Sequence, residues 1–114
     1  MAVFNFTRAN QNQDCKQGAT FTREITLRDE NNAVIDLTGF TGRMQVRVSP
    51  SATEITATVT VTILANVITM ALTATETAAI AAWNYYYDLE LVNGSNVERL
   101  LEGRFEVTPE VTRT

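Results

Sequence analysis

The sequence predicts a mainly β protein, an antiparallel β-sandwich of seven to eight strands with one short helix. Apolar and polar residues alternate with period two over most of the chain, which is typical of strands with one buried face. Turn-forming residues interrupt this alternation about every 8 to 12 residues, as they do between sandwich strands. One alanine-rich segment departs from the alternation and predicts the helix. The 114 residues suffice for one core, so residues 1–114 are expected to form a single domain.

Residues 1–17 are expected to form an edge strand or an arm, followed by a polar loop. The arm carries Phe4 and Phe6, and the stretch from Asn10 to Gly18 is rich in Asn and Gln, as loops are. Two aromatic side chains ahead of a long loop indicate a segment that can add a strand to the sheet of a neighbouring molecule.

The next part of the chain predicts a hairpin and then a bend. Alternation predicts a strand over residues 19–28, and residues 29–32, a run of Asp, Glu and two Asn, predict a turn. A short strand over residues 33–37 completes the expected hairpin. In the bend that follows, Gly39 and Gly42 give the backbone freedom to change direction.

Two strands come next, each with apolar residues on one face and polar residues on the other. In the strand from Arg43 to Val48, Met44, Val46 and Val48 are predicted to lie on one face. Arg43, Gln45 and Arg47 lie on the other. Between Glu54 and Leu64 the predicted inward row is Ile55, Ala57, Val59, Val61 and Ile63. The outward row of the same strand is Thr56, Thr58, Thr60 and Thr62. A row of Thr forms strands well and can also meet another surface.

A further strand and the helix follow a turn at Ala65–Asn66. The strand turns Ile68, Met70 and Leu72 inward. Thr73 and Glu76 then have the spacing of a capping box, in which each side chain satisfies a free backbone amide at the start of a helix. We expect a helix from about Ala74 to Ala82, with Ile80 and Trp83 facing the sheet.

The last two strands give the clearest hairpin signal. One face of the first carries Tyr85, Tyr87, Leu89 and Leu91, and the segment Asn93–Asn96 supplies the turn. In the final strand, from Val97 to Val107, Leu100 falls outside the apolar row, so a bulge or a twist near Gly103 is expected. The number and spacing of the strands are those of an immunoglobulin-like sandwich.

Composition excludes several classes of function. The net charge of −4 and pI of about 4.7, with basic residues spread along the chain, disfavour a nucleic-acid partner. No apolar run approaches the roughly 20 residues of a membrane span. The single Cys15 cannot form an internal disulfide and is expected to be a buried thiol. We therefore expect a soluble intracellular product.

No catalytic, metal-binding or cofactor-binding residues are predicted. The sequence has no His, so zinc sites and His-dependent nucleophiles are excluded. The acidic residues of the last two strands fall on even positions, where a solvated sheet face is favoured over a catalytic pair: Asp88, Glu90, Glu98, Glu102 and Glu106. Tyr86 is expected to be the exposed aromatic of the Tyr85–Tyr87 run, which leaves a sugar-stacking platform as an alternative.

Several segments carry a resemblance to a known group of proteins. They are Asp36–Phe40, Arg43–Arg47, Tyr87–Leu91, Leu100–Gly103 and the ending Val107–Arg113. Their order and spacing, from about Gly18 to Arg113, resemble small β-sandwich virion proteins of tailed bacteriophages and prophages. These proteins include the N-terminal domains of baseplate upper proteins and long tail-fibre proteins. The chain ends at Thr114, where fibre and baseplate relatives continue, so a stand-alone subunit is expected rather than the anchor of a fibre.

The resemblance implies assembly rather than catalysis. The expected role is a virion structural protein, a tail or baseplate adaptor or a capsid decoration subunit, made in the cytoplasm of the host bacterium. Its expected partners are other virion proteins and further copies of itself in a homo-oligomer or symmetric array. The predicted interface residues are Phe4, Phe6, Arg43, Arg47, Thr56, Thr58, Thr60 and Thr62. The alternative is a glycan-binding module carried on the virion.

Overall fold

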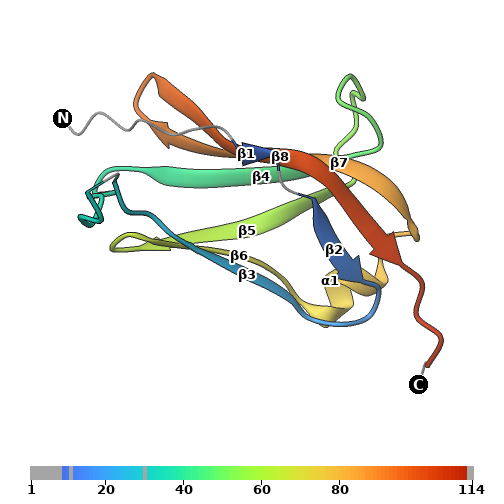
Figure 1. The fold of residues 1–114 in the computed structure, drawn as a ribbon. Helices are drawn as coiled ribbons and strands as arrows, with labels where there is room; N and C mark the ends of the chain where they lie inside the picture. Colours follow the sequence, from blue (N-terminus) through green and yellow to red (C-terminus); the bar gives the residue numbers. More distant parts are fainter. Residues whose placement is uncertain (1–8, 11, 30, 113–114) are drawn as a thin grey trace.

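The predicted β-sandwich is confirmed by the computed structural model, which describes residues 9–10, 12–29 and 31–112 (Figure 1). Eight strands and one short helix make up the described part of the chain. In chain order they are β1 (Ala9–Asn10), β2 (Gln13–Lys16), β3 (Phe21–Thr26), β4 (Thr41–Arg47), β5 (Ala57–Leu64), β6 (Val67–Leu72), α1 (Ala74–Ala78), β7 (Trp83–Asn93) and β8 (Asn96–Thr108).

The strands form a single path that bends into two layers. The order is β1-β8-β7-β4-β5-β6-β3, with β2 also paired to β8. Strand β5 belongs to both layers, because Ala57–Val59 pair with β4 and Thr60–Leu64 pair with β6. Figure 1 shows β4, β7 and β8 in one layer and β3, β5 and β6 running below it. Pairing is antiparallel except that β1 and β2 run parallel to β8. The loop predicted from Asn10 to Gly18 was therefore wrong at Gln13–Lys16, which form β2.

The core lies between the two layers and is filled by the inward rows of the strands. The ring of Phe105 on β8 lies 5.2 Å from that of Phe21 on β3 and 6.2 Å from that of Tyr87 on β7, both edge to face. The inward residues predicted for β6 and β7 are buried, as are Met44 and Val46 on β4 and Cys15 on β2. Val48 follows the end of β4 and is 53% exposed, so its predicted place on the inward face was wrong. Ile55 is an exception. It precedes β5 and is 45% exposed, so its predicted place in the inward row was wrong.

The helix is shorter than predicted. Its capping box is confirmed, since the Thr73 hydroxyl accepts from Glu76 N and the Glu76 carboxylate accepts from Thr73 N. It ends at Ala78 rather than Ala82, because Ala79 N and Ile80 N donate to carbonyls three residues back and tighten the last turn. Ile80 is buried as predicted, whereas Trp83 already belongs to β7 and is 66% exposed, so its predicted packing was wrong.

The hairpin predicted over residues 19–37 forms only at its turn end. Strand β3 pairs with β6 instead. The two predicted arms meet at an antiparallel bridge from Arg28 to Val34, where Ile35 N donates to Leu27 O at 3.4 Å. The turn itself is well made, because the Asp29 carboxylate accepts hydrogen bonds from Asn31 N and Ala33 N, both at 2.8 Å.

The closing hairpin of β7 and β8 is confirmed, with its bulge displaced from the predicted position. Leu89 pairs with Leu101 and Glu90 pairs with Arg99, so Leu100 is the extra residue rather than a residue near Gly103. Leu100 and Leu101 are both 5% exposed. The bulge lets two consecutive leucines enter the core, which explains why Leu100 broke the alternation.

Candidate binding surface

The outward side of β4, β7 and β8 carries nine aligned side chains, which we call the charged face. Cross-strand pairing arranges them in three rows. The paired row is Arg43, Glu90 and Arg99; the acidic row is Gln45, Asp88 and Glu102; the arginine row is Arg47, Tyr86 and Arg104. Each row crosses the three strands in the order β4, β7, β8, on the side opposite the core.

The bulge at Leu100 determines which residues reach this face. Without the extra residue, Leu100 would stand opposite Glu90 on the outside and Arg99 would point into the core. With it, Arg99 joins Glu90 on the charged face. The local irregularity of β8 therefore buries a leucine and exposes an arginine in one step.

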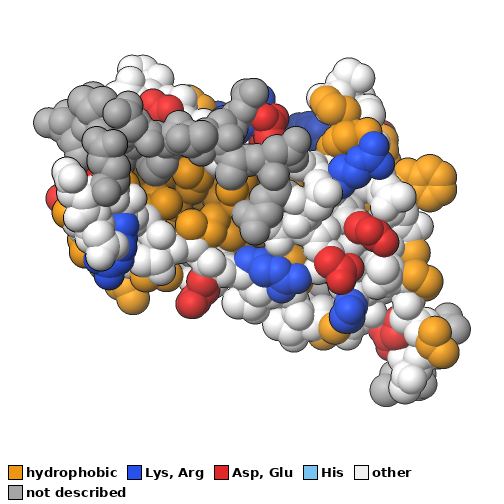
Figure 2. All heavy atoms as spheres, viewed as in Figure 1, with side chains coloured by type: hydrophobic (Ala, Val, Ile, Leu, Met, Phe, Trp, Pro, Cys, Tyr) orange, Lys and Arg blue, Asp and Glu red, His pale blue; other side chains and the backbone are white. Residues whose placement is uncertain are grey.

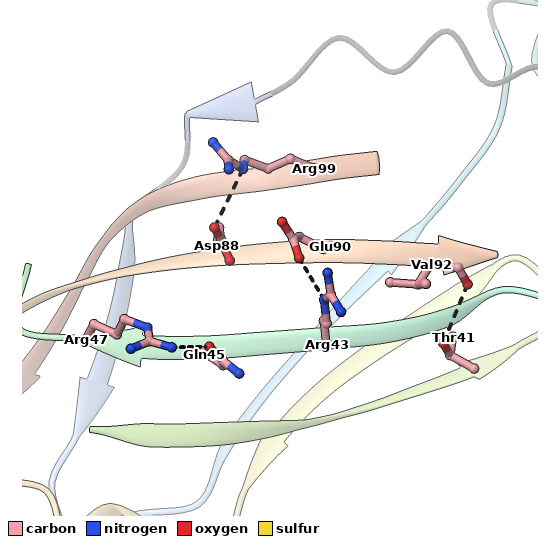
Figure 3. Close-up of polar contacts among 8 residues, drawn as sticks. All are labelled: Thr41, Arg43, Gln45, Arg47, Asp88, Glu90, Val92 and Arg99. Carbon is pink, nitrogen blue, oxygen red and sulfur yellow. Dashed lines mark hydrogen bonds and ion pairs between the residues drawn. The ribbon is translucent and has the colours of Figure 1, made fainter. Parts of the chain in front are cut away.

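Arginine–carboxylate contacts join the paired row and the acidic row (Figure 3). Arg43 Nε donates to Glu90 Oε1 at 2.7 Å. Arg99 lies between two carboxylates, with Nε 3.6 Å from Asp88 Oδ2 and Nη1 3.7 Å from Glu102 Oε2. One guanidinium thus contacts both carboxylates of the acidic row.

The arginine row has the opposite character. Arg47 donates to the carbonyl oxygen of Ala52 and to Oε1 of Gln45, both at 2.9 Å. Figure 3 shows the contact with Gln45 along β4. The guanidinium carbon of Arg104 lies 5.5 Å from the centre of the Tyr86 ring, a cation–π contact. Neither arginine contacts a carboxylate within the described residues, so two positive charges lie at this end of the charged face.

Most of the charged face lines a hollow of about 760 Å³. Asn12, Ser49 and Pro50 contribute to its wall from the segments beside β8 and after β4. The carboxamide of Asn12 accepts a hydrogen bond from Arg104 N at 3.0 Å, which attaches its loop to β8. The hollow is a size that suits a few residues of a peptide or a small polar ligand.

Asp88 is the carboxylate whose ionisation this environment alters. Burial raises its pKa, the nearby charges of Glu90 and Glu102 raise it further, and Arg99 and Arg43 act in the opposite direction. The net effect is a pKa above the ordinary value for Asp.

The predicted interface residues are only partly brought together. Arg43 and Arg47 lie on the charged face, and Thr58 extends it because it pairs with Gln45. Thr56 precedes β5, and its backbone N donates to Val46 O at 2.8 Å. Thr60 and Thr62 pair with Ala71 and Thr69 of β6, in the other layer. Phe4 and Phe6 lie outside the described residues.

Sequence reasoning missed Tyr86 and Arg104 as neighbours and regarded the acidic positions as solvated. Tyr85 and Tyr87 are buried as predicted, but Tyr86 is half-buried rather than exposed. Glu106 is exposed as expected, whereas Asp88, Glu90 and Glu102 are half-buried around the hollow. The turn at Asn93–Asn96 was the signal in the sequence that could have paired residues of β7 with residues of β8, because a hairpin turn sets which residues of its two strands are opposite one another.

The rest of the described chain contains few groups that could react or bind a ligand. Burial raises the pKa of the Cys15 thiol, so this side chain is an unreactive part of the core, as predicted. Among residues 9–10, 12–29 and 31–112, no group of three or more His, Cys, Asp or Glu side chains is placed to hold a metal ion. No helix in the same residues is long and apolar enough to cross a membrane. On the face seen in Figure 2, acidic and basic side chains are interspersed.

Comparisons with known proteins give structural neighbours but no sequence relatives. No family model and no curated protein matches the chain. Among solved structures, the M1 domain from titin is 8% identical with a TM-score of 0.43, over 92% of this chain and 94% of that one. InlP of Listeria monocytogenes is 21% identical with a TM-score of 0.41, over 90% of this chain and 28% of that one.

A family 123 glycoside hydrolase from Clostridium perfringens is 13% identical with a TM-score of 0.43. The match covers 91% of this chain and 24% of the hydrolase. This chain therefore spans about a quarter of the length of the two bacterial proteins. We transfer no residue role from any of the three.

Proposed function

We propose that this chain is a structural protein of a bacteriophage particle that works through protein–protein contacts and carries out no reaction. Within the particle it acts as a tail or baseplate adaptor or as a capsid decoration subunit, repeated by the symmetry of its neighbours. Its partners are other virion proteins and further copies of itself.

The observation that carries this proposal is where the resembling segments lie in the fold. Three of them, Arg43–Arg47, Tyr87–Leu91 and Leu100–Gly103, lie in the neighbouring strands β4, β7 and β8. The outward residues of these three segments make up most of the charged face. Three of the five segments that carry the resemblance thus lie in one sheet and contribute to the surface that it presents, which supports the proposal.

The composition of the charged face favours a protein partner over a glycan. Arginine and tyrosine are enriched in protein interfaces, where they supply planar hydrogen-bonding groups and contact area. A sugar needs an open ring face on which to stack, and the group lying over Tyr86 is the guanidinium of Arg104. We therefore place protein contacts ahead of glycan binding.

Particle incorporation tests the proposed function. Purified particles of the encoding phage should contain the chain, as detected by mass spectrometry. Thr58 is exposed beside the charged face, so Thr58→Arg should block docking and lower the copy number per particle about tenfold. Thr22→Arg, an exposed Thr on β3 in the other layer, is the matched control.

Both variants should melt within a few degrees of the wild type, which separates docking from folding. Absence of the wild-type chain from purified particles would refute the proposal. Wild-type incorporation of Thr58→Arg would remove the charged face as the docking surface.

A further inference from the structure

Asn93 and Gly94 form the only Asn–Gly pair in the sequence. Asn93 ends β7, Gly94 and Ser95 form the turn, and Asn96 begins β8. Figure 1 shows this turn at the end of the molecule opposite α1. A side-chain carboxamide reacts most readily with the backbone nitrogen of the next residue when that residue is glycine, because no Cβ hinders the approach.

The backbone nitrogen of Gly94 is free to react. The pair of Asn93 with Asn96 is the last of the hairpin, so Gly94 lies beyond the ladder, and its N donates no hydrogen bond within the described residues. Gly94 is exposed, and a Cβ built on it would meet no atom within 4 Å apart from those of its chain neighbours. Water and hydroxide therefore have access to this side of the turn.

The carboxamide of Asn93 is also unoccupied. It makes no hydrogen bond within the described chain, and it lies beside Gly39 of the bend, with Oδ1 3.7 Å from the position that a Cβ of Gly39 would take. Asn66 is the contrasting case, because it is buried and its Nδ2 donates to Leu27 O at 2.9 Å. Of these two asparagines, the one followed by glycine is the one whose reacting groups are both available.

The reaction open to these groups needs only water. Gly94 N loses its proton to hydroxide and attacks Cγ of Asn93, so that a bond forms between these two atoms and the carboxamide nitrogen leaves as ammonia. The product is a cyclic succinimide. Water then adds to one of the two carbonyl carbons of the ring and breaks its bond to nitrogen. Opening at one carbon gives an aspartyl residue, and opening at the other gives an isoaspartyl residue, whose main chain runs through the former side chain.

We propose that Asn93–Gly94 is a site of spontaneous deamidation, at which the chain acquires a carboxylate and, in the isoaspartyl form, an additional methylene in its main chain. The carboxylate adds one negative charge to the net charge of −4. The longer main chain no longer matches the spacing at which position 93 pairs with Asn96, so the end of the hairpin opens. This inference is independent of the proposed function, because it concerns the isolated chain.

Peptide mapping of the full chain tests the inference. Purified protein is incubated in warm, mildly alkaline buffer and digested, and mass spectrometry detects the replacement of the amide by a hydroxyl group. Asn96 is the matched internal control, since it belongs to the same hairpin but is followed by the β-branched Val97. We expect conversion at Asn93 to be at least about tenfold faster than at Asn96, which corresponds to a barrier lower by about 1.4 kcal/mol.

The products and the pH dependence identify the route. Aspartyl and isoaspartyl peptides should both appear, with ammonia released in proportion, because both open from the same ring. The rate should rise with pH, since Gly94 N must lose its proton before it attacks.

Variants connect the reaction to its two groups. Gly94→Ala should slow conversion at Asn93 severalfold, although it also strains the turn, because Gly94 has a φ of +61°. Asn93→Gln avoids that strain. It moves the carboxamide one methylene farther from the attacking nitrogen and should abolish isoaspartate formation at position 93. Asn96→Gln, the control for a longer amide in this hairpin, should leave conversion at Asn93 unchanged. Melting temperatures of the variants show that each remains folded.

Three results would overturn the inference. One is conversion at Asn93 that is no faster than at Asn96. Another is an aspartyl peptide without any isoaspartyl peptide, which would indicate direct hydrolysis of the amide. The third is a rate at Asn93 that falls as the pH rises over the alkaline range.

Discussion

Thr77 of α1 joins the helix to the turn that precedes β3. Its Oγ1 accepts a hydrogen bond from Gly18 N at 3.0 Å and donates one to Ala19 O at 2.8 Å. Thr77 is fully buried although it is polar, so these two contacts replace the water that its hydroxyl would otherwise bind. A single hydroxyl thereby connects segments 58 residues apart.

Replacing this hydroxyl with a methyl group should destabilise the fold. Thr77→Val keeps the shape of the side chain and leaves Gly18 N and Ala19 O without their partner, at a cost of about 1–2 kcal/mol. The measurement is the free energy of unfolding in urea. Thr75→Val, at an exposed position of the same helix, is the control for β-branching and should change stability by less than about 0.5 kcal/mol. Equal effects of the two substitutions would contradict the role given to the hydroxyl.

Gly42 on β4 is required by its neighbour Val61 on β5. A Cβ at position 42 would overlap Cγ1 of Val61, within the layer of inward side chains. Gly42→Ala should therefore destabilise by about 1–3 kcal/mol, as overpacked cores do. Val61→Ala removes the overlapping atom, so the double variant should recover part of that loss. Unfolding of the four proteins forms a cycle, and strict additivity would show that this contact is not the cause.

Leu100 should matter to stability as a core residue despite its place in a bulge. It is 5% exposed, and Leu100→Ala should cost about 2–4 kcal/mol. Leu64 offers a matched control with the same chemistry, since it is 82% exposed and Leu64→Ala should cost less than about 0.5 kcal/mol. Thermal unfolding compares the two. A small effect at Leu100 would mean that the bulge, rather than the burial of its side chain, is what the sequence maintains.

The raised pKa of Asp88 predicts a specific pH dependence of stability. The native state keeps a proton on this carboxyl at pH values where the unfolded chain has lost it, so the native state binds more protons. The stabilising contribution of Asp88 is complete below the ordinary Asp pKa of 3.8 and is lost as the pH rises through the higher native value. Ionised Asp88 is thus the less favourable form in the folded protein.

Asp88→Asn should reveal this dependence as a difference between two proteins. Relative to the variant, the wild type should lose stability as the pH rises from about 3 to neutrality. Melting temperatures over this range measure the difference, and exposed Glu106→Gln provides the comparison for removing one acidic residue from β8. A wild type that gains stability relative to Asp88→Asn over the same range would show that the ion pair with Arg99 outweighs burial.

Local patterns predicted most of the strands because each pattern is complete within its own segment. Alternation marked β4, β6 and β7, and the turn residues marked the hairpin of β7 and β8. The partner of β3 was not predictable in this way, because pairing with β6 depends on contacts about 45 residues away rather than on the nearer residues 33–37.

The charged face likewise depends on pairing between strands that are distant in the sequence, rather than on the pattern within one strand. Arg43 and Arg47 were visible as outward residues of one strand, but their neighbours are set by registers between strands. Placing Leu101 and Glu102 required the position of the bulge, because moving it from Gly103 to Leu100 changes which side of the sheet these two residues reach. Alternation alone predicted that Asp88 and Glu102 lie on the outward face of the sheet. Only the fold showed that both contact one arginine, Arg99.

The parallel pairing of β2 with β8 determines how the domain would resist a pulling force. Gln13 pairs with Phe105 and Lys16 pairs with Thr108, so the two strands run in the same direction. The start of β2 and the end of β8 therefore lie at opposite ends of this strand pair. Tension applied before β2 and beyond β8 would slide one strand along the other. The hydrogen bonds of this pair would then bear the load together in shear, instead of opening one after another as they do when a hairpin is peeled apart.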